Sequence, residues 1–307
     1  MFVKPHFFDT FRCKAGDCTD SCCIGWEIDI DSDSLEKYNR VNGEFGKRLK
    51  DNIITDDDCS FFKLCDGDRC PFLNEDNLCD IYINMGEESL CNICKEHPRF
   101  YNEFAGRCEA GIGLCCEKVC EILFGDKSQL EFVTEDDGYD DDFNDSEEQI
   151  IHMRQNIYDV ICNRSEKFTD RLRRISDMEL NNDTVRQIVD IFASTEPINN
   201  DWSEYISKLK DAADELLSIE YDFNETDYEK LLMYIVYRHF TKSVFDGEIK
   251  KWLSFCVVNL LFIHIMDLYT LYVSGDYTYK DRINNVKLWS KQIEYSEENI
   301  EYIADCF

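Results

Sequence analysis

Residues 13–26 read CKAGDCTDSCCIGW, and this stretch, which contains four cysteines, decides how the first part of the chain folds. Small polar turns at Gly16-Asp17 and Thr19-Asp20 let the backbone curl, so that several thiols can converge. Thiolates are soft ligands that select zinc, copper(I) or iron–sulfur clusters over magnesium or calcium. The stretch therefore predicts a metal centre held by cysteine thiolates.

Three further cysteine groups follow, so that fourteen of the seventeen cysteines lie between Cys13 and Cys120. A single Cys-x2-Cys is a weak signal, but four groups within about 110 residues indicate a site with many thiolate ligands. The spacing matches neither the regular run of bacterial ferredoxins nor the paired knuckles of zinc ribbons, so the sequence leaves open which thiols share a centre. The three groups are Cys70-Pro71-Phe72-Leu73 with Cys79, Cys91-x2-Cys94-x2-His97, and Cys115-Cys116-x3-Cys120.

Composition and charge limit the class of protein. The chain has 307 residues, of which 44% are hydrophobic, so it can bury a core without disulfide bonds. Its formal net charge of −31 argues against sequence-independent binding to nucleic acid or to anionic membranes, which needs a basic surface. The first residues contain no long apolar segment followed by a cleavage site, so export is not expected. In a reducing compartment, thiols at this density are metal ligands rather than disulfides, and we predict a cytoplasmic protein.

The pattern along the chain predicts a mainly α fold in three parts. Residues 1–125 form a loop-rich, cysteine-dense metal-binding module, residues 126–147 an acidic linker or loop, and residues 148–307 an all-helical domain. The acidic part includes EDDGYDDDFND at 135–145, a charge run that cannot build a packed element. Residues 252–268 are apolar enough to suggest a membrane span, but Asn259, His264 and Asp267 interrupt them, so we predict a buried central helix.

Few residues outside the cysteines are candidates for chemistry. His97 is the one histidine near the cysteine groups and is a candidate ligand or proton carrier, although a structural turn residue is the commoner role. His239 and His264 lie in apolar helical contexts, where a histidine is usually a satisfied core residue. The sequence contains neither a Gly-x-Gly-x-x-Gly turn nor a Cys-x3-Cys-x2-Cys triplet, because Gly25 stands where the third cysteine would be needed.

The cysteine groups resemble those of the flagellin lysine-N-methylase family and, more distantly, those of zinc- or iron-chelating proteins with clustered cysteines. The resemblance covers about the first 125 residues, and the helical remainder is similar only in type. Members of the family are usually longer, and Cys115-Cys116-Glu117 stands where the family commonly has Ser-Cys-Pro-Glu. The matching blocks run from Phe11-Arg12-Cys13 to Ile30-Asp31, from Cys70 to Cys79, and from Gly86-Glu87 through Leu90, Cys94 and Pro98-Arg99 to the Cys115 group.

The resemblance implies a [4Fe–4S] cluster and methyl transfer from S-adenosylmethionine to lysine side chains of flagellin, with zinc as the alternative metal. Beside such a cluster, Trp26 and Phe72 are candidates for walling it off from water. Arg99 is a candidate contact for an anionic cofactor group, although a surface or salt-bridged role is the commoner one. The resemblance identifies no catalytic residue. A metal-binding or electron-transfer protein and a zinc-stapled helical interaction module remain as alternatives, and the oligomeric state stays open. The family's cysteines fall on Cys13, Cys18, Cys22, Cys23, Cys70, Cys79, Cys94 and on Cys115 or Cys116.

Overall fold

The computed structural model describes residues 1–56, 59–104, 106–125, 127–135 and 145–307. The chain is mainly helical, as the sequence predicts, and divides into two compact units. The cysteine unit contains residues 11–100 and 116–118, and the helical unit contains residues 1–10, 101–115 and 119–307. Eleven of the seventeen cysteines belong to the cysteine unit. The boundaries at 125 and 147 that the sequence analysis gives to the metal-binding module, the linker and the helical domain stay a prediction.

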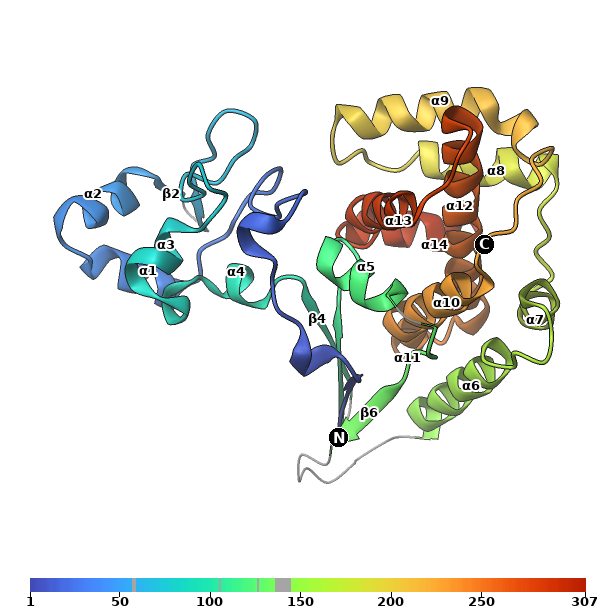
Figure 1. The fold of residues 1–307 in the computed structure, drawn as a ribbon. Coiled ribbons are helices and arrows are strands. Elements are labelled where there is room, and N and C mark those ends of the chain that lie inside the picture. The colour runs from blue at the N-terminus through green and yellow to red at the C-terminus, as the bar shows by residue number, and fades with distance from the viewer. Residues whose placement is uncertain (57–58, 105, 126, 136–144) are drawn as a thin grey trace. The chain divides into compact units, whose positions relative to one another are not determined.

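The cysteine unit is built from short elements (Figure 1). Its strands β2 (Ile53–Thr55) and β3 (Ser60–Phe62) pair antiparallel, with Ile53 opposite Phe62. Loops that carry cysteines connect the elements, so the positions of the thiols depend on contacts between loops and helices. The helices are α1 (Ser32–Arg40), α2 (Gly43–Asp51), α3 (Asp80–Met85) and α4 (Asn92–Glu96).

The helical unit is built around α12 (Ile249–Ser274), which packs against α8, α9, α10, α13 and α14 (Figure 1). Of the helices in the described part of the chain, α12 alone is long and apolar enough to cross a membrane, and 67% of its most apolar window is buried in the structure. The predicted buried central helix is confirmed, because residues 255–263 are all buried. The other helices are α5 (Glu117–Phe124), α6 (Asp145–Ile161), α7 (Phe168–Ile175), α8 (Asn182–Ala193), α9 (Asn200–Leu216), α10 (Glu225–His239), α11 (Ser243–Asp246), α13 (Tyr279–Ile293) and α14 (Glu297–Asp305).

A four-stranded sheet, which the sequence analysis did not predict, has the order β4-β5-β1-β6. Strand β1 (Phe2–Pro5) pairs parallel with β5 (Arg107–Ile112) and antiparallel with β6 (Phe132–Glu135), and β4 (Arg99–Phe104) lies at the other edge beside β5. Strand β6 falls within the predicted linker 126–147. Of that linker, residues 126 and 136–144 lie outside the described residues, and Asp145 already begins α6.

Candidate metal centre

The interior of the cysteine unit is an apolar cluster in which thiols lie among aromatic and aliphatic side chains. Cys70 and Cys91 are buried in it beside Tyr38, Phe62 and Phe72, and three partly buried cysteines pack against it. We call the five the core cysteines, and they come from four separate stretches of chain. They are Cys23, Cys70, Cys79, Cys91 and Cys94.

Backbone contacts bring the first of these stretches together. The amide of Cys70 donates to the carbonyl of Cys23 at 2.9 Å. Arg48 of α2 then fixes the chain after Cys70, because one guanidinium nitrogen donates to the carbonyl of Pro71 at 2.6 Å and another to Asp80 Oδ2 at 2.6 Å. Since Asp80 begins α3 directly after Cys79, this one arginine positions the segments of two core cysteines.

The Asp31 carboxylate positions the other pair. Its Oδ1 accepts from the amide of Ser34, which caps α1, and its Oδ2 accepts from the amide of Asn92 at 2.8 Å. Burial opposes ionisation of Asp31, but these backbone donors outweigh it and the pKa of the carboxyl is lowered. Asn92 begins α4, so a charged Asp31 ties α1 to the helix that carries Cys94 and is preceded by Cys91.

Two hydrogen-bonded thiol pairs favour thiolates. Cys91 Sγ and Cys94 Sγ are 3.3 Å apart, and this hydrogen bond lowers the pKa of Cys91 while it raises that of Cys94. The hydrogen bond from Cys22 likewise lowers the pKa of Cys23 to about 7, and the charge of Arg69 contributes. Because the thiolate is the form that binds metal, each pair makes one of its two cysteines a better ligand.

A second group of thiols surrounds Cys22. The hydrogen bond with Cys23 raises the pKa of Cys22, and electrostatic repulsion from Cys13 and Cys116 adds to the rise. Cys116 reaches this group because Glu117, the next residue, accepts hydrogen bonds from the Lys14 ammonium and from the amide and hydroxyl of Thr19. The Cys22-Cys23 pair therefore joins this group to the core cysteines.

The remaining predicted ligands have different surroundings. Cys18 donates its S–H to the carbonyl of Asp20 at 3.4 Å. Cys115 belongs to the helical unit, where its thiol donates to the Tyr295 hydroxyl at 3.0 Å, whereas Cys116 belongs to the cysteine unit. Cys91 lies among the core cysteines although the resemblance did not select it, and its Cys91-x2-Cys94 spacing was the signal for it. The assignment of ligands stays a prediction.

Both residues predicted to contact a cofactor lie in the cysteine unit. The ring of Trp26 is 6.4 Å from that of His97, measured between centroids. Arg99 places its guanidinium 5.7 Å from the centre of the Phe11 ring, and it donates to the carbonyl of Lys95 at 3.4 Å. Their roles also stay predictions.

The donor set of the cysteine unit fits a thiophilic metal, although the side chains do not form a finished coordination shell. Among the described residues, no group of three or more His, Cys, Asp or Glu side chains is placed so that it could hold a metal ion. Two thiolates on one tetrahedral metal with bonds of about 2.3 Å lie roughly 3.8 Å apart. To bind one metal as thiolates, the Cys91 and Cys94 sulfurs, at 3.3 Å, would need to separate by a small distance and to lose both of their protons.

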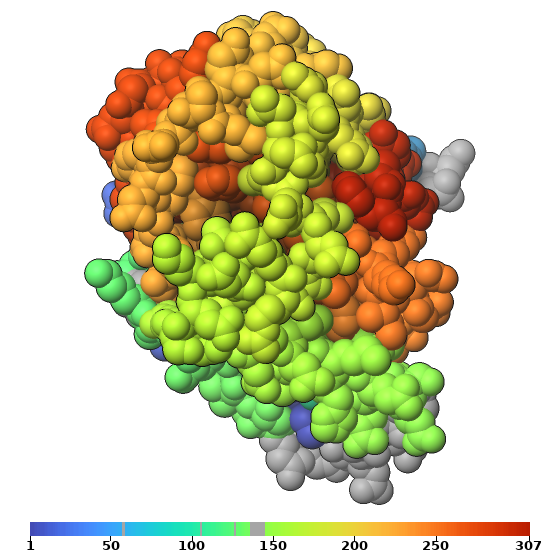
Figure 2. All heavy atoms as spheres, turned by 90° about the vertical axis from the view of Figure 1, so that its right-hand side faces the viewer, coloured from blue at the N-terminus to red at the C-terminus, as the bar shows by residue number. Residues whose placement is uncertain are grey.

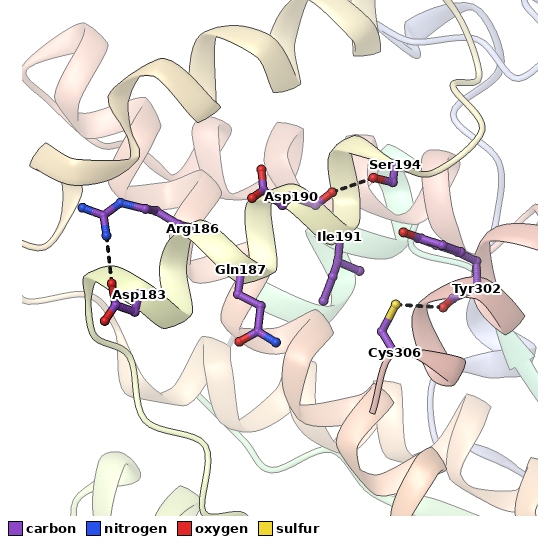
Figure 3. A pocket seen from close by; sticks show the side chains of 8 residues that line it. All are labelled: Asp183, Arg186, Gln187, Asp190, Ile191, Ser194, Tyr302 and Cys306. Atoms are coloured by element: carbon purple, nitrogen blue, oxygen red, sulfur yellow. Dashed lines mark hydrogen bonds and ion pairs between the residues drawn. The ribbon is translucent and has the colours of Figure 1, made fainter.

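A hollow in the helical unit between α8 and α14 is a weaker candidate for a functional site than the cysteine unit. Figure 3 shows Arg186 paired with Asp183 and the Cys306 thiol bonded to the carbonyl of Tyr302. Arg186 also pairs with Asp214 at 2.6 Å, and Lys210 neutralises Asp190 at 2.6 Å. Because its charged groups satisfy one another, the hollow presents no group aimed at a ligand, and we assign it no function.

Comparison with known proteins gives two kinds of match. The model of the FliB lysine N-methylase C-terminal domain matches residues 110–307. The chain is also 28% identical over 134 residues, 42% of its length, to the flagellar biosynthetic protein FliU of Salmonella muenchen, of which the match covers 79%. It is 26% identical over the same length to the lysine-N-methylases of Salmonella typhimurium and Salmonella choleraesuis.

The extent of these matches matters for function. The match spans 33% of the length of each of the two lysine-N-methylases, so most of each of those proteins lies outside the match. No solved structure matches the chain. The family model lies mainly on the helical unit, and this corrects the sequence analysis, which found that the helical remainder is similar only in type.

Proposed function

This chain belongs to the FliB lysine N-methylase family, and from that premise we propose that it is an enzyme that methylates lysine side chains of a protein. The observation that carries the proposal is the family match over the helical unit. The thiol-rich unit on the same chain supports it, because its thiols are ligands for a metal centre that takes part in the reaction.

We further propose flagellin as the protein substrate and S-adenosylmethionine as the methyl donor. One relative is named a flagellar biosynthetic protein and two others are named lysine-N-methylases, which supports a flagellar substrate. The net charge of −31 favours encounter with cationic lysine side chains and disfavours nucleic acid and anionic membranes.

The third part of the proposal is a [4Fe–4S] cluster held by thiolates of the cysteine unit. The core cysteines and the group around Cys22 supply the donors, and Arg48 and Asp31 hold their segments in place. When bound, a cluster supplies redox chemistry or a coordination site for a cofactor's polar groups. Thiols at this density persist in a reducing compartment, which supports a cytoplasmic location.

The test is to purify the protein without oxygen, to measure iron and acid-labile sulfide, and to incubate it with reductant, tritiated-methyl S-adenosylmethionine and flagellin from the same organism. We expect iron and sulfide in comparable amounts and tritium on flagellin lysines. Replacing Cys79 or Cys94 by serine should remove most of the iron and the methyl transfer. The matched control is Cys306→Ser, since this cysteine is exposed on the helical unit.

Other outcomes point to the alternatives. Zinc without iron or sulfide would contradict the cluster. Iron-loaded protein that leaves flagellin unmethylated and does not bind S-adenosylmethionine would contradict the enzyme and favour a metal-binding or electron-transfer protein. Full iron occupancy in both serine variants would exclude the ligand assignment.

A further inference from the structure

A pocket of about 410 Å³ opens within the helical unit, and its lining contains no cysteine. It is lined by α7, by the segment that precedes α10, and by the middle of α12. Figure 2 shows this face, where yellow-green residues of the α7 region border orange residues near residue 221 and darker orange atoms show in the hollow. The volume suits a long side chain together with part of the peptide that carries it.

The floor of the pocket is a chain of hydrogen bonds. The Tyr228 hydroxyl donates to Asp267 Oδ2 at 2.6 Å, and the oxygen of this hydroxyl lies 2.9 Å from His264 Nδ1. The hydroxyl has a single proton, and Asp267 receives it, so His264 must donate its Nδ1–H to Tyr228. This arrangement fixes the histidine tautomer and leaves a lone pair on Nε2.

The Nε2 atom is the acceptor of the pocket. His264 lines the pocket, and Nε2 has no hydrogen-bond partner among the residues that the structure describes. Burial lowers the pKa of His264 to about 4, against the weaker opposing effect of Asp267, so the ring is neutral at physiological pH. A neutral acceptor at the end of a pocket selects a ligand that donates a hydrogen bond.

The walls add aromatic rings and negative charge. Phe223 lies 5.4 Å from the His264 ring and 6.2 Å from the Tyr228 ring, measured between centroids. The lining includes the carboxylates of Glu179, Asp222 and Glu225. Glu179 is paired with Arg173 at 2.9 Å and Glu225 with Arg171 at 3.8 Å, so the negative charge that these arginines leave uncompensated is that of Asp222. Aromatic rings combined with carboxylates attract a cation.

We propose that this pocket binds the side chain of a lysyl residue of the protein substrate, with its ε-ammonium group donating to His264 Nε2. A lysine ammonium has three donors and no acceptor, which matches a pocket of acceptors. Its alkyl chain suits the apolar lining of Leu172, Leu260 and Leu261. The sulfonium cofactor fits less well, because its carboxylate and adenine need donors. The inference rests on the proposed lysine methylation and names where the substrate binds.

The test uses the full chain, labelled at the histidine ring carbons, and two short blocked peptides that differ only in lysine or norleucine. We expect the lysyl peptide to shift the His264 resonance in nuclear magnetic resonance spectra and the norleucyl peptide to bind at least tenfold more weakly. His264→Asn keeps a donor near the Nδ1 position but loses the Nε2 acceptor, so it should weaken lysyl-peptide binding at least tenfold. His264→Gln, which carries an acceptor at the ε position, should restore part of it.

Two further variants keep the inference falsifiable if changes at the pocket floor disturb folding. Asp222→Asn changes an exposed rim residue and should weaken lysyl-peptide binding severalfold, whereas His152→Asn on α6 should leave it unchanged. Equal binding of the two peptides, or a His264 shift caused by S-adenosylhomocysteine and not by the lysyl peptide, would overturn the inference. Flagellin methylation measured on the same protein separates the lysyl pocket from the proposed function. Methylation without lysyl-peptide binding would contradict only the pocket, and binding without methylation would contradict only the proposed function.

Discussion

The two units satisfy their buried polar groups in different ways. In the helical unit, the buried Asp267 carboxylate accepts hydrogen bonds from Tyr228 at 2.6 Å, Tyr277 at 2.6 Å, Arg282 at 2.5 Å and Asn285 at 2.9 Å. A buried charge with this many partners is compensated within the protein. The Asp267 network is therefore complete without a ligand.

In the cysteine unit, the buried thiols oppose one another's ionisation instead. Burial among Cys23, Cys79 and Cys91 raises the pKa of Cys70 to about 12, so that its thiol stays protonated unless a cation lies beside it. Its apolar cluster is also small, and much of it consists of thiols. From this comparison we expect the fold of the helical unit to depend on side chains alone, and that of the cysteine unit to depend on what its thiols bind.

The largest effect should follow removal of the metal, because ligation contributes on the order of 10 kcal/mol to the folding of small thiolate domains. Chelation under reducing conditions should abolish amide-exchange protection in residues 11–100 and leave α10, α12 and α13 protected. Hydrogen exchange followed by mass spectrometry resolves the two units in one sample. If the chelated protein keeps the cysteine unit as protected as the helices, the contrast between the units is broken.

The next effect concerns the helical unit. Arg282→Ala leaves the Asp267 carboxylate buried without its cation and should lower the free energy of unfolding by about 3–5 kcal/mol. Denaturant titration followed by fluorescence reports this unit, since Trp202, Trp252 and Trp289 are buried in it. The matched control is Arg186→Ala, whose ion pairs are exposed and contribute at most about 1 kcal/mol. Equal losses in the two variants would contradict the argument.

Acid pH should sharpen the comparison, because both histidines whose pKa burial lowers, His239 and His264, lie in the helical unit. Such a histidine has a higher pKa in the unfolded state than in the folded state, so protonation favours unfolding. Its contribution to stability is therefore complete above pH ~6.5 and falls as the pH drops towards ~4. For His264 the loss is about 3 kcal/mol over that interval. Unfolding measured at several pH values should show a shallower fall in His264→Asn, and an unchanged slope would exclude His264 as the cause.

The sequence predicts the parts of this structure that local patterns determine. Helical periodicity indicates the helices of the second half, and the long apolar run at 252–268 predicts the buried α12. The sheet cannot be predicted in this way, because β1 pairs with β6 about 130 residues away and these two strands are only four residues long. Cysteine spacing likewise predicts that thiols converge, but not that Cys115 and Cys116 belong to different units.

The pocket shows where pattern reasoning ends. A histidine in an apolar helical context is usually a satisfied core residue. One nitrogen of His264 fits that description, because Nδ1 is hydrogen-bonded to Tyr228, but the residue also lines a pocket together with residues of α7 and of the segment before α10. Periodicity places a residue on a helix face and says nothing of which loops cover that face.

The smallest predicted effect tests whether the Asp267 network depends on the start of α13. Thr278 caps this helix by accepting from the amide of Asp281, whose side chain accepts from the amide of Thr278 at 2.8 Å. Thr278→Ala should cost about 1 kcal/mol, whereas Thr278→Ser, which keeps the hydroxyl, should cost a few tenths.

Tyr277 immediately precedes the cap and Arg282 lies in the first turn, and both donate to Asp267. Loss of the cap should therefore weaken the grip on Asp267, and the double variant with Arg282→Ala should lose less than the two single losses added together. Strictly additive losses would show that the cap and the buried ion pair act independently, and that Asp267 is held by packing rather than by the geometry of the helix end.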